Sequence, residues 1–182
     1  MKKVVITGGP CSGKTTLIEH LSKQNFEVVT EGAIELIEEL NKKMGVEKQK
    51  EWRKENLEEF QKMIVAKQIE KESKIRAGKD EVVFFDRGLY GSLAFSKLAK
   101  VQIDRDLLLT IKSHAYDIVF LLETLSNFQQ RAETGRTSNR EKSIVIGELI
   151  GEVYEENGIE VIFVKEMSVK ERVAFIKGHL NL

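Results

Sequence analysis

The residues with the clearest chemical potential lie in the stretch VVITGGPCSGKTTLIEHL, residues 4–21. Gly8, Gly13, Lys14 and Thr15 satisfy the pattern G-x-x-x-x-G-K-[ST], after an apolar run and before a helical pattern. In such a loop backbone N–H groups surround phosphate oxygens, the lysine neutralises phosphate charge, and the threonine hydroxyl binds Mg²⁺. The sequence therefore predicts a nucleotide phosphate site. The expected contact residues are Gly8, Gly9, Pro10, Cys11, Ser12, Gly13, Lys14, Thr15 and Thr16.

A second candidate site follows the apolar run of VVFFDRG, residues 82–88. An acid that directly follows a buried strand lies at the carboxyl edge of a sheet, where ligands bind, so Asp86 is expected to hold Mg²⁺ directly or through water. The alternative for Asp86 is a helix cap or a surface carboxylate. Arg87 would point at the same edge and suits a phosphate or an anionic acceptor. Its alternative is a structural ion pair with a neighbouring carboxylate.

Another acid, Glu31, follows the apolar run of VVTEGA, residues 28–33. It is expected at the matching position on the same sheet edge. If an acceptor hydroxyl lies there, a carboxylate within hydrogen-bond reach can take its proton or orient it. Because phosphoryl transfer relies mostly on positioning and charge stabilisation, a plain structural carboxylate remains the alternative.

A group of arginines lies in NFQQRAETGRTSNREK, residues 127–142. We expect this segment to act as a lid whose arginines close over the transferring phosphate. Arg136 is the first candidate for this catalytic role. Arg140 follows it as a nucleotide-binding candidate, and Arg131 is the weakest of the three. The alternative is a solvated loop.

Strand and helix patterns alternate along the chain and would position these residues. Five short runs rich in β-branched and aromatic residues occur at 3–7, 26–30, 82–85, 117–122 and 159–164. Most are continuously apolar, which is typical of strands covered on both faces. A helical stripe stops at Asn157-Gly158, and residues 168–171 have capping-box spacing before a last helix. The pattern predicts an α/β fold of three layers, with a five-stranded parallel sheet and helices on both faces.

The exception is the highly charged segment 35–80, between the second and third strand runs. Its thin apolar stripe of Leu57, Phe60, Ile64 and Ile75 predicts a helical lobe of one or two amphipathic helices beside the sheet. With no repeat or low-complexity linker, residues 1–182 are expected to form a single domain. Residues 127–142 would be its lid.

Composition excludes several classes of function. Lys plus Arg and Asp plus Glu both total 29, so no net charge favours nucleic acid or a membrane surface. The single cysteine excludes an intrachain disulfide framework, and the N-terminal apolar run is shorter than a signal peptide requires. The sequence has no guanine-reading N-K-x-D pattern in a suitable position, and its three histidines stand apart. We therefore expect a cytoplasmic protein that binds small molecules, and its oligomeric state stays open.

The motifs ITGGPCSGKTTLIEHL, VVTEGAIELIEEL, FFDRG, YDIVFLLE and TGRTSNR, in this order, resemble a known family. They are similar to the small AAA-type phosphate-loop ATPases and kinases related to the nicotinamide riboside kinase domain, within the nucleoside and nucleotide kinase group. The likeness covers nearly the whole chain and is weakest over 41–80. It implies a nucleotide-kinase sheet, ATP with Mg²⁺ at the loop, and an arginine-bearing lid.

By position, the resemblance assigns phosphate and metal contacts to Gly13, Lys14 and Thr15, and metal binding to Asp86. Glu31 matches the base after the second strand, and Arg136 matches the lid arginine. The leading hypothesis is an ATP- and Mg²⁺-dependent kinase acting on a small hydroxyl- or phosphate-bearing acceptor, with a nucleoside- or nucleotide-like molecule as the favoured class. The alternative is an ATP-driven switch that regulates a protein or RNA partner. A closed pocket near Glu31 would favour the kinase, and an open surface the switch.

Overall fold

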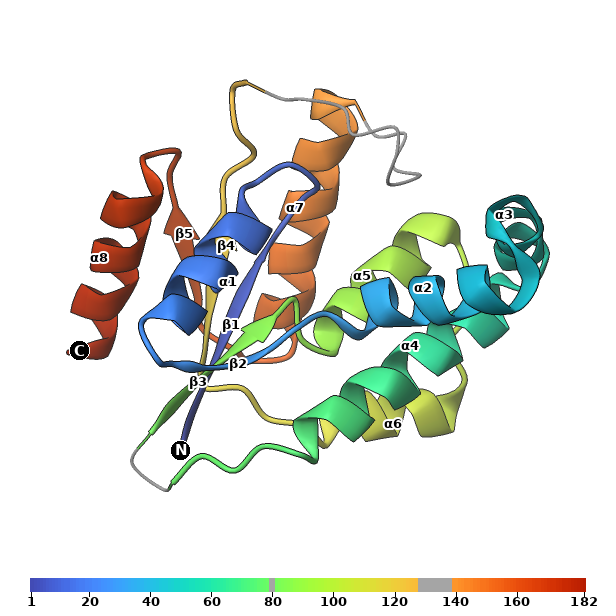
Figure 1. Cartoon of the computed structure of the whole chain (residues 1–182), viewed down its shortest axis with the longest axis horizontal. Coiled ribbons are helices and arrows are strands. Elements are labelled where there is room, and N and C mark those ends of the chain that lie inside the picture. Colours follow the sequence, from blue (N-terminus) through green and yellow to red (C-terminus); the bar gives the residue numbers. More distant parts are fainter. Residues whose placement is uncertain (79–80, 128–138) are drawn as a thin grey trace.

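The computed structural model describes residues 1–78, 81–127 and 139–182. Its centre is a five-stranded parallel sheet with strand order β2-β3-β1-β4-β5 (Figure 1). The strands are β1 (Lys2–Gly8), β2 (Glu27–Val29), β3 (Val82–Asp86), β4 (Ile118–Leu122) and β5 (Val161–Val164). All four pairings are parallel, which confirms the predicted fold class. Each of the five apolar runs overlaps one strand, with bounds that differ by one or two residues.

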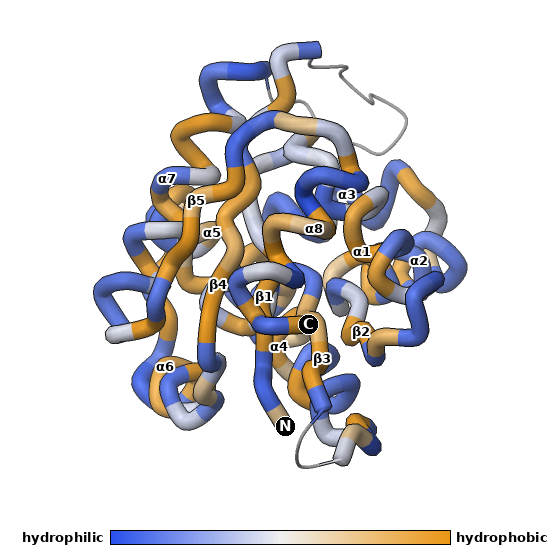
Figure 2. Tube along the Cα trace, turned by 90° about the vertical axis from the view of Figure 1, so that its left-hand side faces the viewer, coloured by the Kyte–Doolittle hydropathy of each residue, from blue (hydrophilic) through white to orange (hydrophobic). Residues whose placement is uncertain are grey.

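Helices cover both faces of the sheet because successive strand residues point to opposite sides. Val5, Phe85 and Val119 pack toward one face, which α5 (Tyr90–Ala99) and α7 (Arg140–Glu156) cover. Their strand neighbours pack toward the other face, under α1 (Lys14–Lys23) and α8 (Val169–Leu180). In Figure 2 the tubes of β4 and β5 are mostly hydrophobic in colour. Strands β1, β3 and β4 are mostly buried on both sides, as their continuous apolar runs predict, whereas β5 at the sheet edge leaves Phe163 exposed.

The helical lobe contains three helices where the sequence analysis expected one or two. They are α2 (Gly32–Met44), α3 (Val46–Glu55) and α4 (Leu57–Glu72), which pack beside the sheet (Figure 1). Gly45, with φ of 85°, separates α2 from α3, and Asn56 separates α3 from α4. The lobe has its own small core of Leu36, Leu40 and Phe60. It begins at Gly32, slightly before the expected boundary at residue 35.

Two local sequence signals set where α7 ends and where the last helix begins. Helix α7 ends at Glu156, just before Asn157-Gly158, where Gly158 has φ of 75°. The predicted capping box opens α8: Ser168 Oγ accepts from Glu171 N at 3.3 Å, and Ser168 N donates to Glu171 Oε2 at 2.9 Å. The remaining helix, α6 (Arg105–Lys112), begins at an Asp104 cap. None of the described helices combines the length and the apolar character that a membrane crossing requires.

Candidate functional site

The glycine-rich loop joins β1 directly to α1. Gly13 is the N-cap of α1 and has φ of 82°, a left-handed conformation that glycine adopts without strain. The turn directs the N-terminus of α1, with its partial positive charge, toward the concave side of the loop. Thr15 and Thr16 are exposed in the first turn of this helix. The local geometry is therefore that of an anion-binding loop.

Helix α7 packs closely against this loop. A Cβ atom at Gly9 would lie 2.0 Å from the carbonyl oxygen of Ser143, so only glycine fits there. The hydroxyl of Ser143 donates to the carbonyl oxygen of Pro10 and lies 3.1 Å from Thr124 Oγ1. Ser143 is completely buried. These contacts fix the loop against the helix that follows the expected lid.

A buried arginine supports the loop from the opposite face of the sheet. Arg172 on α8 donates from Nη1 to the carbonyl oxygen of Ser12 at 2.5 Å, and from Nη2 to that of Glu123 at 3.3 Å. Burial lowers the pKa of its guanidinium. Sequence reasoning missed Arg172. The available signal was an arginine on the buried face of the last helix, between Val169 and Val173.

Lys14 lies inside the loop. Its Nζ donates to the carbonyl oxygens of Gly8 at 2.8 Å and Gly9 at 2.7 Å, and to Ser12 Oγ at 3.2 Å. The side chain is only 7% exposed. The loop thus holds an ammonium group beside the backbone that would surround phosphate oxygens.

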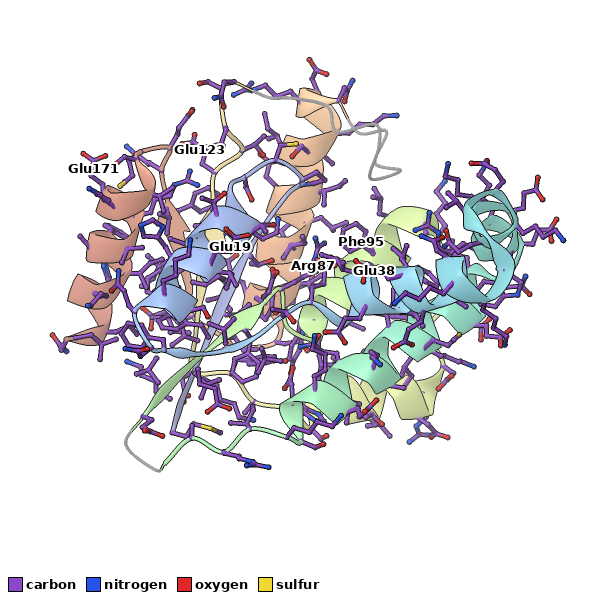
Figure 3. All side chains as sticks on the ribbon, in the orientation of Figure 1. Glu19, Glu38, Arg87, Phe95, Glu123 and Glu171 are labelled. Carbon is purple, nitrogen blue, oxygen red and sulfur yellow. The ribbon has the colours of Figure 1, made fainter. Side chains whose placement is uncertain are left out.

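The two carboxyl-edge candidates, Glu31 and Arg87, contact each other. Arg87 Nε lies 3.0 Å from Glu31 Oε1, and both side chains are largely buried. The structural ion pair considered for Arg87 therefore exists, and it joins the two predicted catalytic residues. The Arg87 guanidinium also lies over the Phe95 ring, 4.7 Å from its centroid (Figure 3). Among the described residues, Arg87 Nε and Nη1 are both buried without a hydrogen-bond partner, so Glu31 contacts Arg87 as an ion pair and not through a hydrogen bond.

The turn that carries Arg87 is tightly held. Arg87 has φ of 72°, which is uncommon outside glycine. Its N–H donates to the carbonyl oxygen of Ile6 at 2.9 Å, and Tyr154 Oη donates to its carbonyl oxygen at 2.5 Å. Asp86, 7% exposed, pairs in register with Ile6 of β1. Asp86 and Arg87 therefore lie at the sheet edge from which the glycine-rich loop emerges.

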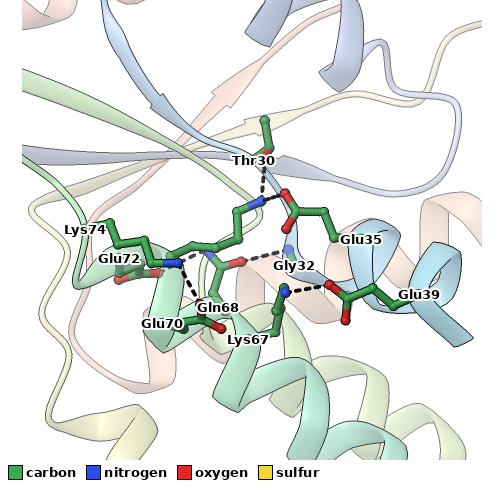
Figure 4. Close-up of polar contacts among 10 residues, drawn as sticks. Thr30, Gly32, Glu35, Glu39, Lys67, Gln68, Glu70, Glu72 and Lys74 are labelled. Atoms are coloured by element: carbon green, nitrogen blue, oxygen red, sulfur yellow. Dashed lines mark hydrogen bonds and ion pairs between the residues drawn. The ribbon is translucent and has the colours of Figure 1, made fainter.

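A buried chain of hydrogen bonds connects the start of α2 to this turn, and Figure 4 shows its first part, from Gly32 through Gln68 to Glu72. Gly32 N donates to Gln68 Oε1 at 2.9 Å, and Gln68 Nε2 donates to Glu72 Oε1 at 3.1 Å. The same oxygen accepts from Tyr116 Oη at 2.7 Å, and Tyr116 Oη accepts from Leu89 N at 2.9 Å. Burial, together with Tyr154 and Glu72, raises the pKa of the Tyr116 hydroxyl well above its usual value. The network holds the backbone on both sides of the Glu31–Arg87 pair.

Ion pairs also join α4 to α2 across the lobe (Figure 4). Lys67 Nζ lies 2.7 Å from Glu39 Oε1, and Lys71 pairs with Glu35 while donating to Thr30 Oγ1 at 2.6 Å. The charged residues that the sequence analysis treated as a solvated face therefore include contacts between helices. These pairs are partly exposed, so each contributes at most about 1 kcal/mol to stability.

A cavity of about 240 Å³ opens from the loop into the helical lobe. Pro10 of the loop, the Glu31–Arg87 pair and Asp86 line one part of it. The rest is lined by Gly88 of the turn after β3 and by α2, α3, α4, α5 and α7, through Gly32, Ala33, Ile34, Ile37, Arg53, Phe60, Gln61, Ile64, Gln68, Ser92, Phe95 and Ile146. The lining is mostly apolar with a few converging polar groups, which is typical of a small-molecule site.

The lid candidates are only partly placed. Arg140 is exposed in the first turn of α7, which Asn139 caps by accepting from Lys142 N at 2.9 Å. Arg131 and Arg136 lie outside the described residues. In the described part of the chain, no three or more His, Cys, Asp or Glu side chains gather as a metal site.

A family model described as an AAA domain matches residues 3–172 of the chain. The chain belongs to the AAA-domain family. This match confirms the AAA-type resemblance noted in its motifs. Comparison with curated proteins finds no match.

Solved structures with the same fold as this AAA domain include two nucleotide-metabolism kinases. Deoxyadenosine kinase from M. mycoides with bound dATP is 20% identical, with a TM-score of 0.65 over 99% of this chain and 100% of that one. Thymidylate kinase from Candida albicans is 14% identical, with a TM-score of 0.59 over 99% of this chain and 91% of that one. At these identities the similarity establishes the nucleotide-kinase fold.

A third similar structure is the NadR protein in complex with NR. It is 16% identical to this AAA domain, with a TM-score of 0.72. The match covers 100% of this chain and 51% of NadR. The AAA domain therefore corresponds in fold to about half of that protein.

Sequence reasoning singled out charged residues that the structure places in the loop or at the carboxyl edge of the sheet, and it missed the groups that hold them. Lys14, Glu31, Asp86 and Arg87 each lie in or directly after a recognisable strand or loop motif. The supporting groups come from distant segments, and their polar types carry no periodic signal. They are Gln68, Glu72, Tyr116, Ser143, Tyr154 and Arg172.

Proposed function

We propose that this AAA domain is a kinase that transfers the γ-phosphoryl group of ATP to a small acceptor bound in the cavity. The observation that carries this proposal is that one cavity adjoins both the glycine-rich loop and the buried Glu31–Arg87 pair. A cavity of this kind suits a small molecule better than a macromolecular partner. This favours the kinase over the switch. The favoured acceptor is a nucleoside- or nucleotide-like molecule with a hydroxyl or phosphate group.

The proposed roles follow from position. Lys14 and the backbone N–H groups of the loop would hold the β- and γ-phosphates of ATP. Glu31 would accept the proton of an acceptor hydroxyl as its oxygen bonds to the γ-phosphorus. The bond from that phosphorus to the β–γ bridging oxygen breaks, and ADP leaves. Arg87, held by Glu31 and with Nη1 buried, would stabilise negative charge on the acceptor side.

The residues present fit a magnesium ion. Mg²⁺ prefers oxygen ligands and is commonly held by one or two protein groups together with substrate phosphates. Thr15, in the first turn of α1, and Asp86, at the end of β3, supply a hydroxyl and a carboxylate at one edge of the sheet. The ion would neutralise charge on the phosphates. We propose the lid role for Arg136 and a nucleotide contact for Arg140, and a cytoplasmic location for the whole chain.

The test is ADP release from ATP and Mg²⁺ by the purified protein, alone and with a panel of nucleosides, nucleotides and nicotinamide riboside. We expect release only in the presence of certain acceptors, and none from the Lys14→Ala variant. A Lys23→Ala variant, changed at the other end of α1, is the matched control. Release that is indifferent to every acceptor would contradict the kinase and favour an ATP-driven switch.

A further inference from the structure

The part of the cavity formed by α3 and α4 has its own polar groups. Arg53 lies on α3 and Gln61 on α4, and both line the cavity together with Phe60. Figure 1 shows α3 at the end of the lobe that is remote from the sheet. These residues therefore form the far end of the cavity, and the Glu31–Arg87 pair with the loop forms the near end.

Arg53 is a cation with no carboxylate partner in the part of the chain that the structure describes. Its guanidinium makes no ion pair or hydrogen bond with the described residues and lies over the Phe60 ring, 5.4 Å from the centroid. Burial lowers its pKa, so the charged form is partly desolvated. By contrast, Lys62 and Lys67 on α4 both pair with carboxylates. The far end of the cavity therefore carries a positive charge, on Arg53, that no carboxylate of the described residues compensates.

Gln61 is a second polar lining residue whose amide has no hydrogen-bond partner among the described residues. It is 8% exposed and makes no hydrogen bond with the described residues. Gln68 lies about two turns further along α4. By contrast, its amide oxygen and its amide nitrogen both form hydrogen bonds within the protein. Because Gln61 lines the cavity and the described residues do not use its amide, that amide is available to a molecule in the cavity.

The charges along the cavity differ between its two ends. At the near end, Glu31 compensates Arg87, and Asp86 adds a second carboxylate to the lining. At the far end, Arg53 is the charged lining residue and lies over the Phe60 ring, and the apolar side chains of Ile37 and Ile64 line the same cavity. An oxyanion at this end would compensate the charge of Arg53 and would accept hydrogen bonds from the N–H groups of its planar guanidinium.

We propose that Arg53 and Gln61 form a subsite for a carboxylate group of the acceptor, at the end opposite its phosphorylated group. The inference rests on the proposed kinase function and narrows its acceptor to an organic anion. A carboxylate can accept two parallel bonds from the Arg53 guanidinium and a further bond from the Gln61 amide. The apolar middle of the cavity would hold a ring.

Trp52 provides a direct readout of this subsite. It is the only tryptophan of the chain, it precedes Arg53 on α3, and it packs against the small core of the lobe. Its fluorescence can be titrated without ATP using two matched pairs of probes. Each pair differs in one carboxylate: nicotinic acid riboside against nicotinamide riboside, and orotidine against uridine.

We expect at least one carboxylate probe to bind the wild type at least tenfold more tightly than its neutral-group partner. Arg53→Met should abolish this preference, Arg53→Lys should keep part of it, and Gln61→Leu should weaken it. Lys54→Met, which removes an exposed cation from the same helix, should leave it unchanged. Equal binding within both pairs, a preference that survives Arg53→Met, or no saturable binding by either carboxylate probe would overturn the inference.

This binding experiment separates the subsite from the kinase proposal. An Arg53-dependent preference for carboxylate in a protein whose ADP release ignores every acceptor would support the subsite and contradict the kinase. Acceptor-dependent release whose KM and kcat are the same in wild type and Arg53→Met would support the kinase and contradict the subsite. Circular dichroism of each variant confirms that the lobe remains folded.

Discussion

At the residue scale, the chemistry depends on the Glu31–Arg87 pair. We expect Glu31→Gln to reduce phosphoryl transfer by about 10²-fold or more, the range typical of a positioned general base. Binding of ATP should change by less than about twofold, because Glu31 lies on the acceptor side of the cavity. Steady-state kinetics and ATP titration measure the two effects. Unchanged transfer in Glu31→Gln would remove this carboxylate from the mechanism.

A comparison with Arg87→Met tests whether the pair acts as a unit. The two side chains are 3.0 Å apart, so their effects on transfer should not add in the double variant. Each single change leaves the other charge buried and unpaired, which is why we expect both to be costly. Additive losses would show that Glu31 and Arg87 act separately.

At the element scale, the glycine-rich loop depends on its close contact with α7. A methyl group at Gly9 would overlap the carbonyl oxygen of Ser143, so Gly9→Ala should lower the unfolding free energy by about 1–3 kcal/mol. It should also weaken ATP binding, because the loop must shift. Gly178→Ala is the control: that position on α8 has no atom within 4 Å and should gain about 0.5–1 kcal/mol. Urea denaturation measures the unfolding free energy of both variants. Equal changes in Gly9→Ala and Gly178→Ala would contradict the close contact between the loop and α7.

The elements also show what the sequence could predict. Strands were recognisable because their apolar runs are continuous, and the loop because its motif is local. The lobe was harder, since the buried residues of α4 include Gln61, Gln68 and Glu72 beside Phe60 and Val65. Apolar periodicity therefore understates the buried face of this helix. Gln61 and Gln68 also supply polar groups to the cavity. Because their burial has no periodic signal, the sequence did not predict the far end of the cavity.

At the scale of the whole molecule, buried tyrosines tie stability to pH. Burial raises the pKa of both Tyr116 and Tyr154 well above 10 in the folded protein. Unfolded tyrosines lose their protons near pH 10, so above that pH the unfolded state binds fewer protons than the folded state. The unfolding free energy should then fall by about 1.4 kcal/mol per pH unit for each tyrosine.

Urea denaturation between about pH 9.5 and 11 tests this linkage. Other groups titrate in the same range, so the comparison is between the wild type and the single variants Tyr116→Phe and Tyr154→Phe. Each variant should be less stable at neutral pH, because a buried hydrogen bond is lost, and should show a shallower fall above pH 10. A slope identical to that of the wild type in both variants would contradict the assignment.

The central claim is that the cavity holds the molecule that receives the phosphoryl group. The most direct measurement follows the γ-phosphate of radiolabelled ATP, with Mg²⁺ and an acceptor that stimulates ADP release. We predict that the label appears in the acceptor in a one-to-one ratio with ADP, and that Lys14→Ala and Glu31→Gln reduce both products together. Label recovered as inorganic phosphate, with an unmodified acceptor, would contradict a kinase.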